Sequence, residues 1–476
     1  MNSYGLLGEK LGHSFSPTIH KQLWDCDYDL IPLPKDEVDD FFRQRAFAGI
    51  NVTIPYKQVA CQTCEHVDPK AKAIGAVNTV VNRDGELYGY NTDYDGFLYC
   101  ARRAGIKFAG KKVLILGSGG TSLTARNAAA DEGASEVVII SRSKHSETAG
   151  SSQSASDTNV PAGAPNATTV SDTGTPGTAQ NAAISDTGAP DTTPHTVGIT
   201  RKCPLSFDTY DNLAACHSDA QIIINTTPVG MYPKNYASPV DLELFPNLSG
   251  VFDAIYNPGT TMLVYQARQK GIPATCGLPM LVSQAAYAAE HFCGRAFTTE
   301  EVEKVLASVR AETANIVLIG MPGCGKTTVG KLLAERLNRE VIDVDALIVE
   351  REGRSIPDIF TQDGEEVFRQ LETEAAKIAG SRSGVIISCG GGLPMREANH
   401  FPLLQNGRVY YLNRDISQLS IAGRPLSANR SGLPDMYAKR HPVYQALCHR
   451  EFTVTEGSPE AVIEKIVEDF YENTGH

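Results

Sequence analysis

Two glycine-rich loops contain residue types that could bind nucleotides, and each follows an apolar segment predicted to be a strand. Gly117–Gly120 follows Val113–Leu116, and Gly320–Thr327 follows Ile316–Ile319. The second loop has the full pattern Gly-x-x-x-x-Gly-Lys-Thr, whose backbone N–H groups surround phosphates while its lysine reaches the β- and γ-phosphates. The first loop has the glycines that a tight turn and the approach of a pyrophosphate to a helix N-terminus require. The sequence therefore predicts two nucleotide sites and two enzymes on one chain.

The strand after the first loop indicates which dinucleotide that loop binds. Val137–Ile140 leads into a turn at the place where an NAD-binding fold has a carboxylate for the ribose 2′-hydroxyl. This turn has no acid, and its two cations favour a 2′-phosphate and hence NADP(H). A solvated basic turn is the alternative interpretation. The residues of this region predicted to bind the cofactor are Gly117, Ser118, Gly119, Gly120, Ser141, Arg142 and Lys144.

Polar residues upstream of the first loop suit a polyhydroxylated ligand. If the run from residue 51 to residue 57 is extended, Asn51, Thr53 and Lys57 share one face. A lysine paired with Asp93 could transfer a proton at a carbonyl group. Taken singly, each of these residues is more often a turn or capping residue than a ligand. The candidates are Ser14, Ser16, Asn51, Thr53, Lys57, Asn78 and Asp93.

Residues in and after the second loop favour a kinase over a GTPase or a motor ATPase. Thr327 can ligate magnesium through its hydroxyl group. The next predicted strand ends in Asp343 and Asp345, and strand alternation would place both acids on one face toward the phosphates. Three arginines beside glycine-rich turns suit a carboxylate ligand and a lid over ATP, although a single arginine on a helix is more often a surface charge. They are Arg369, Arg424 and Arg440, and the glycines are Gly390, Gly391 and Gly392.

The composition argues against several other classes of function. A net charge of −12 does not suit broad nucleic-acid binding. Eleven scattered cysteines predict reduced thiols, and Cys61-x-x-Cys64 lacks the second pair that a zinc site would need. The N-terminus has no signal-peptide pattern, and no apolar run is long enough to span a bilayer. We expect a cytoplasmic monomer or homodimer whose partners are small molecules, with neither nucleic acid nor membrane among them.

Short apolar strands alternate with helical patterns along the chain, which predicts α/β domains with parallel sheets. Residues 145–197 break the pattern, because they are rich in Ser, Thr, Ala, Gly, Pro and Asp, and we expect a disordered insert there. Thr298 and Glu301 form a capping box before apolar residues at helical spacing, which predicts a linker helix over residues 298–313.

The upstream motifs occur together in an order that resembles shikimate dehydrogenase over residues 1–297. The resemblance implies a substrate lobe (1–100 and 278–297) and a Rossmann-type NADP-binding lobe (101–277), with NADPH reduction of 3-dehydroshikimate to shikimate. It also implies that Lys57 and Asp93 are the catalytic pair, that Tyr256 and Gln284 join the substrate ligands, and that Asn225 and Thr226 lie beside the cofactor. One departure is Lys21 after His20, where the family usually has Asn. The other departure is the insert, which begins where a helix normally follows the strand.

The downstream motifs resemble shikimate kinase over residues 314–476, a P-loop α/β domain like that of nucleoside-monophosphate kinases. The resemblance implies that Lys326 and Asp345 are catalytic, with Asp345 on the acceptor hydroxyl and Asp343 near the magnesium ion beside Thr327. Arg424 corresponds to the lid arginine, and Ser427 replaces a common leucine in that lid. The implied ATP ligands are Gly323, Cys324, Gly325, Lys326, Thr327, Thr328 and Arg424. The implied shikimate ligands are Asp345, Arg369, Gly390, Gly391, Gly392 and Arg440.

The two resemblances together predict a bifunctional enzyme that makes shikimate and then phosphorylates its 3-hydroxyl, with NADP(H), ATP and Mg²⁺ as cofactors. One alternative is a quinate/shikimate dehydrogenase of broader specificity fused to the kinase. Another is that one module has become a non-catalytic binding domain. The four residues whose loss would signal such a change are all present, namely Lys57, Asp93, Lys326 and Asp345.

Overall fold

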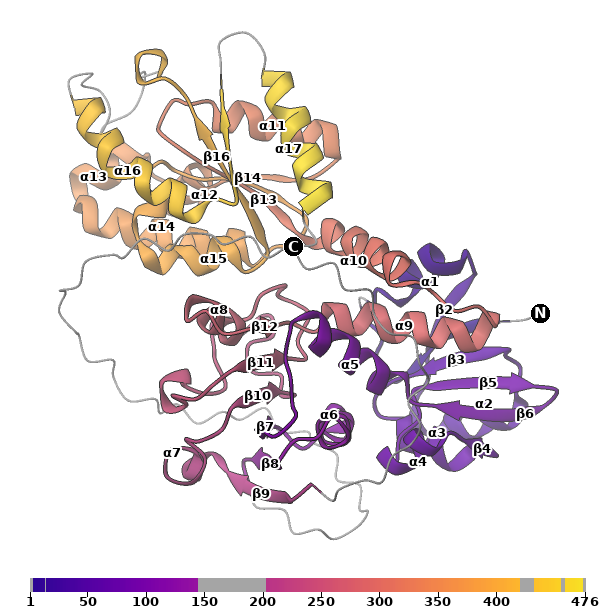
Figure 1. Ribbon diagram of the computed structural model, residues 1–476. Helices are drawn as coiled ribbons and strands as arrows, with labels where there is room; N and C mark the ends of the chain where they lie inside the picture. The colour runs from indigo at the N-terminus through magenta and orange to yellow at the C-terminus, as the bar shows by residue number, and fades with distance from the viewer. Residues whose placement is uncertain (1–2, 13, 144–202, 420–431, 455–458, 474–476) are drawn as a thin grey trace. The chain divides into compact units, whose positions relative to one another are not determined.

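The computed structural model describes residues 3–12, 14–143, 203–419, 432–454 and 459–473. The predicted insert therefore lies outside the described residues, as do Lys144, Arg424 and Ser427. The described elements belong to one compact unit of the chain. They form three sheets with helices on their faces (Figure 1), which confirms the predicted α/β class.

The first sheet is mixed, with the strand order β2-β1-β3-β5-β6-β4. Strand β5 runs antiparallel to both of its neighbours, whereas the other pairs are parallel. The strands are β1 (Tyr4–Gly8), β2 (Tyr28–Pro32), β3 (Gly49–Val52), β4 (His66–Val67), β5 (Thr79–Arg83) and β6 (Glu86–Tyr90). The accompanying helices are α1 (Ser16–Trp24), α2 (Val38–Gln44), α3 (Lys57–Thr63) and α4 (Pro69–Ile74).

The second sheet is entirely parallel, with the strand order β12-β11-β10-β7-β8-β9. Alternate residues of β7 enter different cores, since Val113 and Ile115 pack on one face and Leu114 and Leu116 on the other. Apolar burial on both faces is typical of a parallel sheet covered by helices. The strands are β7 (Lys112–Leu116), β8 (Glu136–Ser141), β9 (Leu205–Thr209), β10 (Ile222–Asn225), β11 (Gly250–Asp253) and β12 (Ala274–Thr275). The helices are α5 (Thr92–Arg103), α6 (Gly120–Asp131), α7 (Leu213–Cys216), α8 (Met262–Gln269) and α9 (Leu278–Cys293).

Helix α10 (Thr299–Thr313) follows the second sheet and has the N-terminus that the sequence predicts. The Thr298 hydroxyl accepts a hydrogen bond from the Glu301 N–H, and the Glu301 carboxylate accepts one from the Thr298 N–H, which completes the capping box. The apolar residues Val302, Val305 and Leu306 are buried against α1 and α9. The helix is thus fixed by both its cap and its packing.

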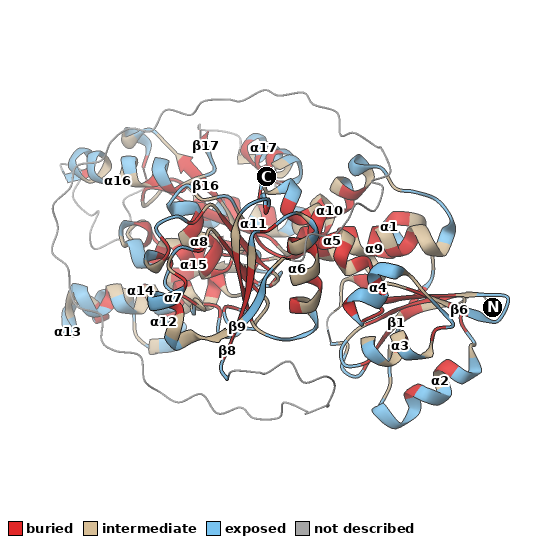
Figure 2. Ribbon diagram, turned by 60° about the horizontal axis from the view of Figure 1, so that its bottom comes forward, coloured by how far each residue is buried: buried red, intermediate tan, exposed pale blue. Residues whose placement is uncertain are grey.

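The third sheet is parallel and has the strand order β14-β15-β13-β16-β17. Its central strands are largely buried, and Figure 2 colours the buried residues of the molecule red. The strands are β13 (Asn315–Ile319), β14 (Val341–Asp343), β15 (Ile386–Ser388), β16 (Gly407–Asn413) and β17 (Arg450–Thr453). The helices are α11 (Lys326–Leu337), α12 (Val344–Glu352), α13 (Ile356–Gln362), α14 (Gly364–Gly380), α15 (His400–Leu404), α16 (Leu433–Leu447) and α17 (Pro459–Asn473). The strand predicted to lead into the phosphate loop is β13.

Candidate active sites

Lys57 and Asp93 form an ion pair at the start of two helices. Lys57 is the first residue of α3 and Asp93 lies in the first turn of α5, where the helix N-terminus favours a carboxylate. The Lys57 Nζ atom donates to Asp93 Oδ2 at 2.6 Å. The two side chains are only 23% and 16% exposed, so water is largely kept away from the pair while a small ligand can still reach it. Such a pair can hold and pass a proton at a carbonyl group.

A cavity of about 310 Å³ surrounds this ion pair and is lined largely by polar groups. The structure brings into it every residue that the sequence and the first resemblance place around the substrate. These residues are Ser14, Ser16, Asn51, Thr53, Lys57, Asn78, Asp93, Tyr256 and Gln284. They come from both sides of the first glycine loop in the sequence, so only the fold assembles them.

The path of the chain from Asn51 to Lys57 differs from the predicted extended run. Strand β3 ends at Val52, and the Tyr56 N–H then donates to the Thr53 carbonyl at 2.9 Å in a turn that contains Pro55. A proline has no N–H to continue a strand ladder, which is the reason that the extended prediction is wrong. The turn places Lys57 on α3, and Asn51, Thr53 and Lys57 still line the same cavity.

Asn51 is held in place by four internal contacts. Its Oδ1 atom accepts from the Tyr28 hydroxyl at 2.6 Å and lies 3.2 Å from His20 Nε2. Its Nδ2 atom donates to the Asn78 carbonyl and to Thr79 Oγ1. Burial lowers the pKa of His20 to about 3, so this ring is neutral at physiological pH. The neighbouring Lys21 is exposed and pairs with Asp25, so the departure from the family pattern stays outside the cavity.

Asn78 connects the first sheet to helix α9. Its Oδ1 atom accepts from the Thr92 N–H at 2.7 Å, and its Nδ2 atom donates to Thr92 Oγ1 and, at 3.4 Å, to Gln284 Oε1. Thr92 was not singled out from the sequence, although its position directly before Asp93 could have suggested it. Through these hydrogen bonds Thr92 helps to fix both Asn78 and the start of α5, the helix that contains Asp93.

The first glycine loop joins β7 to α6 beside the same cavity. Gly117 has φ +102°, and a Cβ atom there would lie 2.9 Å from Thr226 Oγ1, so this position requires glycine. Gly119 is the N-cap of α6, whose first turn has no acidic residue and is open to an anion. Thr121, in that first turn, lines the substrate cavity. Sequence reasoning did not select it, and the fold places it between the loop and the cavity around Lys57 and Asp93.

The other residues predicted to bind the dinucleotide have different environments. Arg142 is exposed after β8, where a cofactor phosphate could reach it. Ser141 is buried, and its hydroxyl donates to the Ser143 carbonyl. Asn225 is fully buried, with its amide donating to Asp253 and Val229 and its Oδ1 atom accepting from Thr227. These internal hydrogen bonds hold the turn after β10, and the contact of Asn225 with the cofactor stays a prediction.

The second glycine loop connects β13 to α11 and contains the expected lysine. The Lys326 Nζ atom donates to the carbonyl oxygens of Gly320 and Met321, both at 3.0 Å, and is buried. Thr327 Oγ1 donates to Asp343 Oδ2 at 3.0 Å. A hydroxyl and a carboxylate therefore stand together beside the phosphate loop, as magnesium ligation would require.

Asp345 lies on a helix, which corrects the strand assignment made from the sequence. Strand β14 ends at Asp343, and Asp345 lies in the first turn of α12. The reason is local, because Asp343 Oδ1 accepts from the N–H groups of Asp345 and Ala346 and so caps a helix that begins there. Both acids nevertheless line one cavity of about 540 Å³ with the phosphate loop.

Arginines and glycines complete this second cavity. Arg369 on α14 pairs with Glu372 at 2.5 Å, and Glu372 is 2% exposed. Burial raises the pKa of Glu372, and Arg369 opposes that rise. A Cβ atom at Gly390 would lie 2.5 Å from Asp345 Oδ1, so a glycine at this position lets the backbone approach that carboxylate closely. Arg440, Gly391 and Gly392 line the cavity too, as do Glu372 and Arg414, which sequence reasoning did not select.

Comparisons with known proteins find relatives of both parts of the chain. Residues 6–80 match the model of the shikimate dehydrogenase substrate binding domain, and residues 322–471 match the shikimate kinase model. The shikimate dehydrogenase (NADP(+)) of Clostridium perfringens is 30% identical over 302 residues, covering 62% of this chain and 93% of that protein. That of Halothermothrix orenii is 33% identical, covering 61% and 90%. The crystal structure of shikimate dehydrogenase 1 from Peptoclostridium difficile has a TM-score of 0.50 and 29% identity, covering 65% and 98%.

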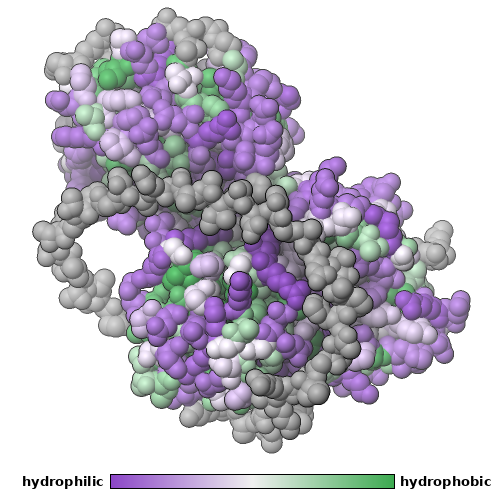
Figure 3. All heavy atoms as spheres, in the orientation of Figure 1, coloured by the Kyte–Doolittle hydropathy of each residue, from purple (hydrophilic) through white to green (hydrophobic). Residues whose placement is uncertain are grey.

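Every helix within the described ranges falls short of the length and apolarity that crossing a bilayer requires. Hydrophilic residues predominate on the face drawn in Figure 3. The two family models match separate parts of the chain, and the two relatives are covered over 93% and 90% of their own length. The chain belongs to the shikimate dehydrogenase family and continues into a shikimate kinase domain, and it is an enzyme with both activities.

Proposed function

We propose that the protein reduces 3-dehydroshikimate to shikimate with NADPH and then phosphorylates the shikimate 3-hydroxyl with ATP. The observation that carries the proposal is the Lys57–Asp93 ion pair at 2.6 Å inside a cavity of hydroxyl and amide groups. This ion pair suits a carbonyl that becomes a hydroxyl in a polyhydroxylated ring. The kinase cavity then suits a charged ligand, because arginines and a phosphate loop line it together.

In the first reaction Lys57 donates a proton to the carbonyl oxygen, and Asp93 orients the ammonium group and stabilises its charge. When bound, NADPH supplies the hydride. The cofactor fits the chain, because Gly119 and the uncharged first turn of α6 leave an anion site and Arg142 is exposed beyond β8. We propose that the hydroxyls of Ser14 and Ser16 and the amides of Asn78 and Gln284 bind the polar groups of the substrate.

In the second reaction Asp345 accepts the proton of the attacking hydroxyl, while Arg369 and Arg440 hold the carboxylate of shikimate. Lys326 leaves its contacts with the loop carbonyls and neutralises phosphate oxygens instead. Magnesium, when bound with ATP, supplies further charge neutralisation. It fits Thr327 and Asp343, since the ion commonly takes one or two protein ligands and completes its shell with phosphates and water.

We further propose the domain limits given above: a substrate lobe over 1–100 and 278–297, a cofactor lobe over 101–277, a linker helix over 298–313 and a kinase domain over 314–476. A cytoplasmic location is consistent with eleven cysteines that are all free thiols, five of them buried. We also propose that the partners of this protein are small molecules, because the polar and charged groups that line both cavities suit small polar ligands.

Incubation with 3-dehydroshikimate, NADPH, ATP and Mg²⁺ tests the proposal, and shikimate 3-phosphate is the expected product by mass spectrometry. Omission of ATP should leave shikimate, and omission of NADPH should leave the ketone unchanged. Accumulation of shikimate in the complete mixture would refute the kinase part. Oxidation of quinate with NADP⁺ as fast as that of shikimate would favour the broader dehydrogenase instead.

A further inference from the structure

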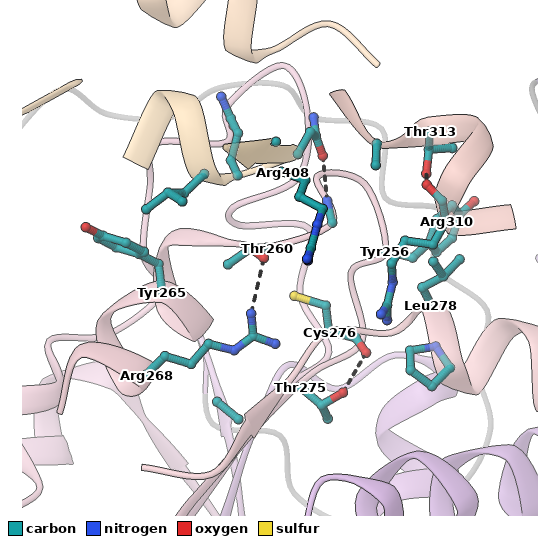
Figure 4. A pocket seen from close by; sticks show the side chains of 18 of the residues that line it. Tyr256, Thr260, Tyr265, Arg268, Thr275, Cys276, Leu278, Arg310, Thr313 and Arg408 are labelled. Carbon is teal, nitrogen blue, oxygen red and sulfur yellow. Dashed lines mark hydrogen bonds between the residues drawn. The ribbon is translucent and has the colours of Figure 1, made fainter. Parts of the chain in front are cut away.

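A third cavity, of about 390 Å³, is rich in arginine (Figure 4); it shares Tyr256 with the dehydrogenase cavity and no lining residue with the kinase cavity. Arg103 from α5, Arg268 from α8 and Arg310 from α10 line it together. Arg408 at the start of β16 lines it as well. Among the described residues that line this arginine cavity there is no Asp or Glu, so the carriers of formal charge in the lining are the arginines.

Carboxylates outside the lining pair with two of these arginines, and one of these carboxylates, Glu303, also acts to raise the pKa of Arg310. Arg103 pairs with Glu303 at 2.7 Å, and Arg408 pairs with Asp469 at 2.8 Å. Arg268 makes a 3.4 Å hydrogen bond to Thr260 Oγ1, which adds no negative charge. Guanidinium groups of this kind are suited to bidentate binding of phosphate or carboxylate.

The pKa of Arg310 shows the effect of the neighbouring positive charges. Burial has the largest effect, repulsion from Arg103 and Arg268 adds to it, and together they lower the pKa of Arg310 to about 10. An anion placed among the three guanidinium groups would remove this repulsion, and the field in a partly enclosed cavity is screened less than at an open surface.

We propose that the arginine cavity binds a small organic anion with a phosphate or carboxylate group. Arg268 and Arg310 would hold the anion, and the hydroxyls of Thr260 and Thr275 lie on the same wall. Tyr256 lines both this cavity and the substrate cavity, so the bound anion lies one side chain away from the dehydrogenase substrate. This site is separate from the phosphate loop and from the dinucleotide loop.

Titration calorimetry of the full-length protein tests the site, with inorganic pyrophosphate and citrate as separate probes. We expect Arg268→Gln to weaken the binding of the preferred probe by about tenfold or more, the usual effect of losing a charged hydrogen bond. Lys270→Gln is the matched control, because Lys270 is exposed, pairs with Glu243 and does not line the cavity. We expect any binding of pyrophosphate to the phosphate loop to be equal in all variants, so the comparison isolates the arginine cavity.

The two probes distinguish a phosphate ligand from a carboxylate ligand, and binding of either through Arg268 supports the proposal. Equal affinities in wild type and Arg268→Gln, or equal losses in Arg268→Gln and Lys270→Gln, would overturn it. Arg310→Gln should also weaken binding. If burial of that position prevents folding, the exposed Arg268 still decides the outcome.

Discussion

The dehydrogenase cavity and the kinase cavity of this chain differ in their charges. Only Lys10, Lys57 and Asp93 are charged among the residues that line the first, where neutral hydroxyls and amides predominate. The second brings together four cations and three carboxylates, namely Lys326, Arg369, Arg414, Arg440, Asp343, Asp345 and Glu372. A proton can be transferred by one well-placed ion pair, whereas phosphoryl transfer requires many charges to be balanced at once.

We expect the largest effect from a substitution that removes the Lys57–Asp93 ion pair of the dehydrogenase cavity. Lys57→Ala should lower the dehydrogenase kcat/KM by about 10³, within the range for loss of a general acid, and leave the kinase rate unchanged. Spectrophotometric NADPH assays and a coupled ATP assay measure the two activities. Lys70→Ala is the control, because Lys70 pairs with Asp95 outside the cavity. A parallel fall in both activities would contradict the separation of the two sites.

The corresponding change in the kinase removes the lysine of the phosphate loop. Lys326→Ala should lower kcat of the kinase by about 10² to 10³, the usual cost of losing one donor to developing charge, with dehydrogenase activity retained. Lys331→Ala, an exposed position on the same helix, controls for the loss of charge. Kinase turnover equal to wild type would show that the charges of the second cavity are redundant.

The two parts of the chain also differ in how they stabilise a buried carboxylate. Asp253 is held by neutral hydrogen-bond donors, whereas Glu372 pairs with Arg369. Asp253 is fully buried and accepts from Asn225, Thr261 and the Ile255 N–H, and burial raises its pKa to about 7. A carboxyl group whose folded pKa is raised stabilises the fold below its ordinary pKa of 3.8 and loses that contribution as the pH rises to about 7.

Asp253→Asn should therefore remove this pH dependence from the free energy of unfolding of the dehydrogenase part. Between pH 5 and 7 we expect the wild type to lose on the order of 2 kcal/mol from this group, and the variant to lose none of it. Thermal unfolding across that pH range measures the difference, with the exposed Asp211→Asn as control. Identical pH profiles for wild type and Asp253→Asn would contradict the raised pKa.

We expect the smallest effect at Glu372, the buried carboxylate that pairs with Arg369. Glu372→Gln keeps the shape of the side chain but weakens its hold on Arg369, so we expect KM for shikimate to rise about tenfold with a smaller change in kcat. Initial-rate kinetics separate the two constants. Glu374→Gln, on the same helix and exposed, serves as control. A change confined to kcat would mean that Glu372 acts on the chemical step.

Local sequence signals predicted much of this architecture correctly. The strand β13 before the phosphate loop, the strand β7 before the first glycine loop and the capping box at Thr298 all depend on neighbours a few residues apart. The two errors came from continuing a strand too far. At Lys57 a turn containing Pro55 intervenes, and at Asp345 the cap formed by Asp343 starts a helix.

Thr92, which sequence reasoning missed, acquires its importance through distant partners, because it is fixed between Asn78 and Thr79. Asn78 and Gln284 were both predicted from the sequence, but only the fold brings them together across 206 positions. The arginine cavity draws on three helices that no local pattern connects. Such juxtapositions depend on packing, which a single sequence does not reveal.

The sequence by itself determined the two glycine loops, the chemistry of their lysine and hydroxyl groups, and many candidate residues of both sites, because these depend on residue type and short spacing. Others, such as Tyr256 and Gln284, came only from the resemblance to shikimate dehydrogenase. The tertiary structure decided that Lys57 pairs with Asp93, that Asn51 and Asn225 are held by internal hydrogen bonds, and that Glu372 is buried against Arg369. The physical reason is that hydrogen bonding, burial and charge pairing act over a few ångströms in space. Only the fold sets those distances.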